Sequence, residues 1–163
     1  MSLTELLLAA LWLGIGATLV LDCWSWLLTR LFAVPAPNYC LVGRWFSLMP
    51  KGQFCHQSIS QAAPQQAECV LGWLLHYLIG ISFVLPLLWW QQGQWLRQPE
   101  IGQALWLGGS TVLLPFLLMQ PAFGLGIAAA NTASPWRARL RSLVNHLMFG
   151  VGIYLSGWLW PFA

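Results

Sequence analysis

The sequence predicts an all-α, polytopic membrane protein with four transmembrane helices and a short interfacial helix in the first cytoplasmic loop. Of its 163 residues, 58% are apolar and only 7% are charged. A soluble domain is typically about 25% charged because its surface faces water. The composition therefore excludes a soluble enzyme, and the few basic residues form no patch that would bind nucleic acid. The whole chain, 1–163, is expected to form a single four-helix transmembrane domain.

Four windows are long and apolar enough to cross a bilayer core of about 30 Å. The spans are expected at about 3–30, 67–91, 101–120 and 141–162. The first is not a signal peptide, because residues 1–5 contain no basic residue and the apolar run is too long. The short connection at 91–100 joins the second and third spans into an antiparallel hairpin. The third span is expected to kink at Pro121 and to continue through the small residues of 124–130.

The connection at 31–67 is too long to be a simple link. Pro35 and Pro37 end the first helix, and apolar residues then recur with helical periodicity. They are Leu41, Val42, Trp45, Phe46, Leu48 and Met49. Because Arg44 lies among them and Pro50 ends the run, the pattern predicts a short helix in the membrane interface.

Basic residues predict the orientation of the spans. Six of the seven lie in the first and third connections: Arg30, Arg44, Lys51, Arg137, Arg139 and Arg141. Cytoplasmic loops are enriched in Lys and Arg, so both long connections are expected in the cytoplasm and both termini in the periplasm. Trp residues are expected in belts at the two interfaces, with Trp45 in the inner belt and Trp95 in the outer one.

An ionisable residue inside a span costs about 2.5–3.5 kcal/mol to insert, so each one suggests a functional site. Asp22 is the clearest case, because it shares one face of the first span with four small or polar residues at helical spacing. They are Gly14, Thr18, Ser25 and Thr29. This stripe is expected to face protein or a water-filled cleft, since a carboxyl group facing lipid would be unpaired.

The other three spans also carry polar residues in their cytoplasmic halves, at a depth similar to that of Asp22. They are His76, Gln120, Asn145 and His146. We expect these five residues to form one buried site, open or gated toward the cytoplasm, that binds a ligand or relays protons. An Asp–His pair suits proton coupling because an imidazole exchanges its proton near neutral pH.

Three classes of function stay open at this point. The leading hypothesis is binding or transport of a polar or cationic ligand or of protons, by a homodimer or larger assembly because four helices are few for a transport path. The second is a membrane-embedded enzyme or redox protein, with a metal held by Asp22, His76 and His146 or a haem between the two imidazoles. The third is an accessory or assembly subunit without a ligand.

An enzyme is the less favoured class, since the chain has no acyl-transfer or phosphate-binding motif. No cofactor is predicted, and a metal or haem belongs to the second class alone.

The four cysteines all fall toward the predicted cytoplasmic side, where thiols stay reduced. They are Cys23, Cys40, Cys55 and Cys69. Free buried thiols are therefore expected. A zinc site formed by Cys40, Cys55, His56 and Cys69 is the alternative.

Several strings resemble a family of small four-span bacterial inner-membrane proteins that is catalogued only as a domain of unknown function, number 2938. They include GIGATLV at 14–20, VGRW at 42–45, MPKG at 49–52, LGW at 71–73, MQP at 119–121 and GLGIA at 124–128. The resemblance spans nearly the whole chain. It implies a bacterial inner (cytoplasmic) membrane setting with the lipid bilayer as partner, but no activity. It also draws attention to Asn38, Arg44 and His56, which are expected to close over the buried site as a loop gate.

Overall fold

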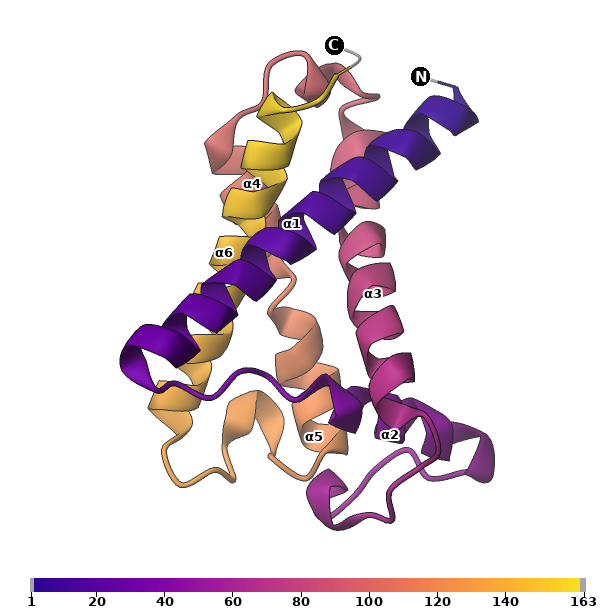
Figure 1. Ribbon diagram of the computed structural model, residues 1–163, viewed down its shortest axis with the longest axis vertical. Coiled ribbons are helices and arrows are strands. Elements are labelled where there is room, and N and C mark those ends of the chain that lie inside the picture. The colour runs from indigo at the N-terminus through magenta and orange to yellow at the C-terminus, as the bar shows by residue number, and fades with distance from the viewer. Residues whose placement is uncertain (1, 162–163) are drawn as a thin grey trace. The chain divides into compact units, whose positions relative to one another are not determined.

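The computed structural model describes residues 2–161, and this part of the chain is all-α without strands. Figure 1 shows the helices in chain order from indigo to yellow. They are α1 (Leu3–Phe32), α2 (Tyr39–Leu48), α3 (Glu68–Trp90), α4 (Ile101–Ser110), the short α5 (Gln120–Ala122) and α6 (Pro135–Trp158). Three segments are long and apolar enough to cross a membrane: Leu3–Phe32, Glu68–Trp90 and Ile101–Ala122. The all-α class with candidate membrane spans is therefore confirmed.

The predicted fourth span corresponds to α6, which is not one of these three segments. Its first turns carry Arg137, Arg139 and Arg141, and Asn145 and His146 follow, which lowers the hydropathy of the helix. Residue 162, at the end of the predicted span, lies outside the described residues. The number of four spans stays a prediction.

The chain forms two compact units, which are described here one at a time. Unit 1 contains residues 1–36, 77–111 and 144–163, and unit 2 contains residues 37–76 and 112–143. Helices α3 and α6 contribute residues to both units. The organisation of the chain as a single domain stays a prediction.

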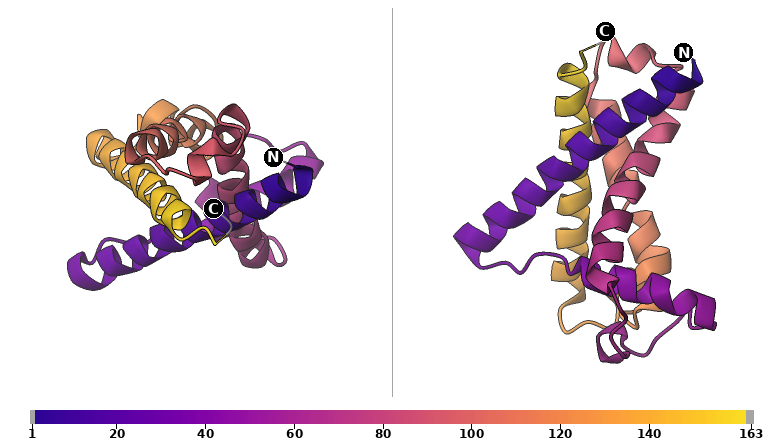
Figure 2. Two further views of the ribbon diagram at one scale, coloured as in Figure 1. Left: turned by 90° about the horizontal axis from the view of Figure 1, so that it is seen from above. Right: turned by 45° about the vertical axis from the view of Figure 1, so that its right-hand side comes forward.

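Unit 1 is built on α1, which begins with a capping box. The N–H of Glu5 donates to the Ser2 hydroxyl, and the N–H of Ser2 donates to the Glu5 carboxylate. The helix crosses the unit 1 parts of α3 and α6, as both Figure 1 and Figure 2 show. Small and apolar residues fill these crossings and form one buried core, which includes Ala9, Ala10, Leu13, Ala17, Val84, Leu88, Phe149 and Ile153.

Glycines allow the helices of unit 1 to approach closely, as is common between membrane helices. A Cβ atom on Gly150 of α6 would lie 2.7 Å from the carbonyl oxygen of Ala104 in α4. A Cβ atom on Gly152 would lie 2.6 Å from the Cα atom of Ala17 in α1. Neither position has room for a side chain, because the neighbouring atoms belong to a helix backbone.

We therefore expect Gly150→Ala to destabilise the protein by about 1–3 kcal/mol through overpacking. Gly102→Ala is the matched control, since a Cβ atom on Gly102 of α4 meets nothing within 4 Å. Replacing this glycine is expected to be neutral or to stabilise by about 0.5–1 kcal/mol, because alanine favours the helix. Thermal unfolding of both variants in detergent measures the difference, and equal midpoints would contradict the packing at Gly150.

Unit 2 has its own core, formed by α2 and the chain that folds against it. Trp45 packs edge-on against Phe123, with ring centroids 5.6 Å apart, and its indole N–H donates to the Phe54 carbonyl oxygen at 2.8 Å. Trp45 is 7% exposed, and Trp95 in unit 1 is 3% exposed. Each of these two Trp residues therefore packs in the core of its unit, and their place in interfacial belts stays a prediction.

The segment that follows α4 departs from α-helical geometry at Pro115. Since proline has no N–H, residues Pro115–Met119 form the π-helical turn η4, in which the N–H of Gln120 bonds to the Pro115 carbonyl. The expected continuation of the helix past Pro121 is wrong. α5 ends at Ala122, and Gly124 then adopts a φ of +87°, which favours glycine and turns the chain.

Candidate functional site

Three residues of the predicted polar stripe of α1 contact α3 inside unit 1: Gly14, Thr18 and Asp22. Thr18, which is 1% exposed, lies against Gly80, where a Cβ atom would overlap the threonine hydroxyl. One turn further along α1, the Asp22 carboxylate accepts a hydrogen bond from the Tyr77 hydroxyl, with Oδ2 and Oη 2.9 Å apart. The half-buried Asp22 carboxyl group is therefore held by a phenol of the neighbouring helix.

His146 forms a second polar pair in unit 1. Its Nδ1 lies 2.7 Å from the hydroxyl oxygen of Thr111, at the end of α4. The Thr111 hydroxyl donates its single proton to the Gly108 carbonyl oxygen. The imidazole therefore donates its Nδ1–H to Thr111, which leaves Nε2 as the nitrogen that can accept a proton.

The helices that carry Asp22, Tyr77 and His146 meet at Gly80. Gly80 of α3 contacts Thr18 of α1 and also lies close to Phe149 of α6, whose Cε2 atom would be 3.5 Å from a Cβ on this glycine. Each of three polar residues lies about one helical turn from one of these residues along its own helix. Asp22 follows Thr18, Tyr77 precedes Gly80, and His146 precedes Phe149.

We call the four residues of the two pairs the polar layer: Asp22, Tyr77, Thr111 and His146. Asn145 precedes His146 on α6 and is half-buried. Ser25, one turn beyond Asp22, is 8% exposed, and its hydroxyl has no hydrogen-bond partner among residues 2–161. The two pairs contain a carboxyl, a phenol and an imidazole, which are groups that can bind a cation or pass a proton.

Two members of the polar layer, Tyr77 and Thr111, were not predicted as site residues. From α3 the prediction took His76 and not its neighbour Tyr77. Helical spacing places both residues about one turn before Gly80 and does not choose between them.

His76 and Gln120 belong to unit 2. The His76 ring stacks on Tyr39, with centroids 3.8 Å apart. Gln120 is 6% exposed, and its amide nitrogen donates to the Ser142 hydroxyl at 3.4 Å, whereas its amide oxygen has no hydrogen-bond partner in the described part of the chain. The meeting of all five predicted residues in one site stays a prediction.

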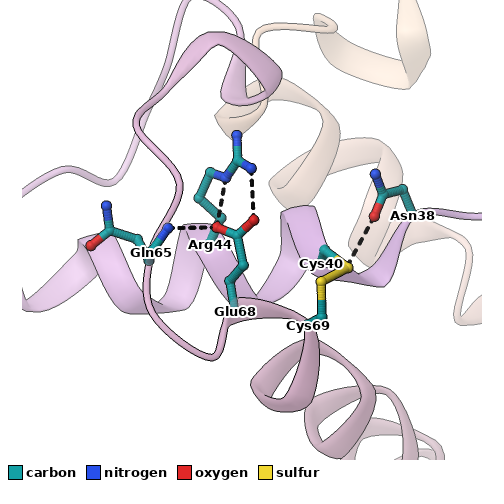
Figure 3. The surroundings of a disulfide bond; sticks show 6 residues. All are labelled: Asn38, Cys40, Arg44, Gln65, Glu68 and Cys69. Atoms are coloured by element: carbon teal, nitrogen blue, oxygen red, sulfur yellow. Dashed lines mark hydrogen bonds and ion pairs between the residues drawn. A yellow bond between two sulfur atoms is a disulfide. The ribbon is translucent and has the colours of Figure 1, made fainter.

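Arg44, a predicted gate residue, holds three segments of unit 2 together. Its Nε and Nη2 atoms donate to the two carboxylate oxygens of Glu68 at 2.9 and 2.7 Å (Figure 3). Its Nη1 atom donates to carbonyl oxygens of the adjoining loop, those of Ile59, Ser60 and Ala62. The hydrogen bonds to Glu68 hold the pKa of the Arg44 guanidinium above its ordinary value. In this arrangement Arg44 ties α2, the loop and the start of α3 to one another.

The other two gate residues also have structural contacts in unit 2. The Asn38 side chain caps α2 by accepting the N–H of Cys40 at 3.1 Å. The N–H of His56 donates to the Ala122 carbonyl oxygen at 2.8 Å, and its Nε2 atom is buried without a hydrogen-bond partner among the residues described. A gating movement of these residues stays a prediction.

An open cavity of about 500 Å³ lies on unit 2, beside the loop that follows α2. Its lining is rich in amide side chains and includes Lys51, Gln53, His56, Gln57, Gln61 and Gln65. Lys51 donates to the Gln65 amide oxygen at 2.7 Å. Of the predicted site and gate residues, His56 is the one that lines this cavity.

The cysteines differ from the prediction, because Cys40 and Cys69 form a disulfide bond (Figure 3). The expected free, buried thiols are therefore wrong for this pair, and the other two cysteines are free but exposed: Cys23 and Cys55. The disulfide forms because α2 and α3 cross at Gly43 and Gly72. Cys40 and Cys69 each lie three residues before one of these glycines, so the crossing brings the two cysteines together. In the state that the structure shows, the alternative zinc site is not formed, because the disulfide uses two of its four ligands.

No group of three His, Cys, Asp or Glu side chains within residues 2–161 could hold a metal ion. The proposed metal ligands Asp22, His76 and His146 thus gain no support from the geometry. The haem alternative stays a prediction.

Comparison with known proteins adds a family match without an activity. A family model described as "Protein of unknown function (DUF2938)" matches residues 11–160. No curated protein and no solved structure matches the chain.

Proposed function

Since the chain belongs to the DUF2938 family of proteins of unknown function, we propose a function from the polar layer: this membrane protein couples the movement of a small polar or cationic molecule to that of protons. The observation that carries the proposal is the hydrogen bond between Tyr77 of α3 and Asp22 of α1, which are both candidate membrane spans. The Thr111–His146 pair of the same unit supports it, and we propose that the two pairs lie at one level in the membrane. Ionisable groups at such positions mark ion pathways and proton relays in membrane proteins.

The Asp22 carboxyl group is the proposed point of exchange. A carboxylate in an apolar helix binds a cation, whereas the protonated acid does not, so that a proton and a cationic molecule compete for it. Tyr77 donates to the carboxylate and fixes its direction. The unpaired Ser25 hydroxyl, one turn away, offers a further polar contact to a bound molecule.

His146 is the proposed proton carrier of the layer. Thr111 receives the Nδ1–H and so keeps Nε2 free of its own proton. An imidazole in this tautomer can accept a proton at Nε2 and release it again, as a relay requires. Asn145 and Gln120 are the proposed neutral hydrogen-bond partners, and His76 the second imidazole of the relay.

The proposed topology has α6 as the fourth span, both termini in the periplasm, and the basic connections in the cytoplasm of a bacterial cell. The charge distribution along the chain supports this orientation. A homodimer or larger assembly would supply the enclosed path that four helices provide poorly.

Purified protein in proteoliposomes tests the proposal. Vesicles loaded with the pH dye pyranine and with tetramethylammonium, and diluted into buffer without this cation, are expected to acidify as the cation leaves and protons enter. A second arm drives proton uptake alone with a potassium gradient and valinomycin. The proposal requires that proteoliposomes acidify faster than protein-free vesicles in at least one arm. If proteoliposomes and protein-free vesicles acidify at the same rate in both arms, the proposal is contradicted.

A further inference from the structure

We propose that Cys40 and Cys69 form a reversible redox-modification site: a dithiol in unstressed cells that a peroxide converts into the disulfide. The proposal rests on the orientation proposed above, which places this end of unit 2 in the cytoplasm. Cytoplasmic disulfides of ordinary bacteria are rare, and those that occur are usually transient, catalytic or redox-sensing. A disulfide in this position is therefore best explained as one state of a switchable pair.

The contact between α2 and α3 is built without the disulfide. A Cβ atom on Gly43 would overlap the Glu68 carbonyl oxygen, and a Cβ atom on Gly72 would overlap the Tyr39 carbonyl oxygen, so the two backbones touch. The Arg44–Glu68 ion pair also links α2 to α3 beside this contact. These interactions keep the two sulfur atoms close after reduction, so that the bond can form again without refolding.

Both thiols have surroundings that favour reaction. Each is the second residue of its helix, Cys40 in α2 and Cys69 in α3, where the positive end of the helix dipole stabilises a thiolate. Cys69 is exposed, so that an oxidant or a reductant can reach it. The carboxylate beside it, Glu68, is neutralised by Arg44.

The chemistry balances with hydrogen peroxide as the oxidant. One thiolate attacks a peroxide oxygen, which breaks the O–O bond and gives a sulfenic acid and, after protonation, one water molecule. The second thiol attacks the sulfenic sulfur, forms the S–S bond and releases the oxygen as a second water molecule. In total the two thiols lose two electrons and two protons, and the peroxide gains both. A cellular dithiol reverses the step by thiol–disulfide exchange.

The redox state would act on the first turn of α2. Tyr39 is adjacent to Cys40 and stacks on His76, two turns into α3. In the oxidised state the disulfide adds a covalent link that holds the Tyr39–His76 stack in place. In the reduced state only non-covalent contacts hold it. Oxidation is therefore expected to hold His76 in the orientation that the structure shows.

The test uses the full-length chain with Cys23→Ala and Cys55→Ala, so that Cys40 and Cys69 are its only thiols. Cells are quenched with acid, and free thiols are then coupled to a maleimide that adds a visible mass on a gel. We expect two adducts in unstressed cells, none after brief exposure to hydrogen peroxide, and two again after recovery. Absence of adducts before peroxide, or two adducts that persist through it, would overturn the proposal. Cys40→Ala in the same background controls for the gel shift and should show one adduct before peroxide is added.

A separate arm tests the orientation. A chain that keeps Cys55 alone is treated in spheroplasts with a maleimide that cannot cross the membrane, since Cys55 is exposed. We expect labelling only after lysis. A permanent disulfide together with labelling from outside would refute both the orientation and the redox site. A permanent disulfide with a protected Cys55 would refute the redox site alone and leave the proposed function standing.

Discussion

Replacing Asp22 with Asn is expected to lower coupled proton movement to the rate of protein-free vesicles. Asparagine has nearly the volume of aspartate, and its amide oxygen can still accept the hydrogen bond that Tyr77 donates. What it cannot do is gain or lose a proton or attract a cation. The variant should therefore fold like the wild type and fail in the pyranine assay.

Glu5→Gln is the matched control for Asp22→Asn. Glu5 is an exposed carboxyl on the same helix, and glutamine can preserve the capping box with Ser2. Its transport rate should equal that of the wild type. If Asp22→Asn transports as well as Glu5→Gln, the polar layer has no part in transport and the accessory class of function becomes the better account.

Replacing Arg44 with Met is expected to destabilise the protein by about 3–5 kcal/mol, because it leaves the partly buried Glu68 carboxylate without its partner. Arg44 is 9% exposed and donates to both oxygens of this carboxylate. Its Nη1 atom also satisfies loop carbonyl groups, which the variant would leave unpaired. Denaturant unfolding in detergent, followed by circular dichroism, measures the loss.

Two further substitutions provide reference values for the loss of stability in this experiment. Arg44→Lys keeps the charge but loses the forked geometry, and should fall between Arg44→Met and the wild type. Lys51→Met removes an exposed cation with one hydrogen bond, to Gln65, and should cost less than about 1 kcal/mol. A cost of Arg44→Met no larger than that of Lys51→Met would contradict the structural role of the Arg44–Glu68 pair.

The helical architecture could be predicted largely from the sequence, because apolar periodicity and helix signals act locally. The run from Leu41 to Met49, for example, predicts a helix, and α2 occupies Tyr39–Leu48. The predicted fourth span is not among the candidate spans of the structure, because the basic and polar residues of α6 reduce its hydropathy. The π-helical turn at Pro115 was missed because a proline indicates a local break but not how the helix accommodates it.

The candidate site could be predicted only in part. The Asp22 stripe follows from helical spacing, and the structure places it against α3. The partner of Asp22 could not be derived from spacing alone, because adjacent residues on α3 point about 100° apart and a small difference in helix rotation decides between His76 and Tyr77. The Cys40–Cys69 disulfide depends on how α2 folds back onto α3, and nothing local in the sequence reports such a long-range contact.

The central claim is that Asp22, Tyr77 and His146 form one functional level in the membrane. An experimental structure in a lipid nanodisc tests it most directly. The account predicts that the Asp22 carboxylate keeps its hydrogen bond to Tyr77 and that ordered water or a bound molecule connects it with His146 Nε2. Apolar side chains packed between Asp22 and His146, with each polar group bonded only to its own neighbour, would contradict it.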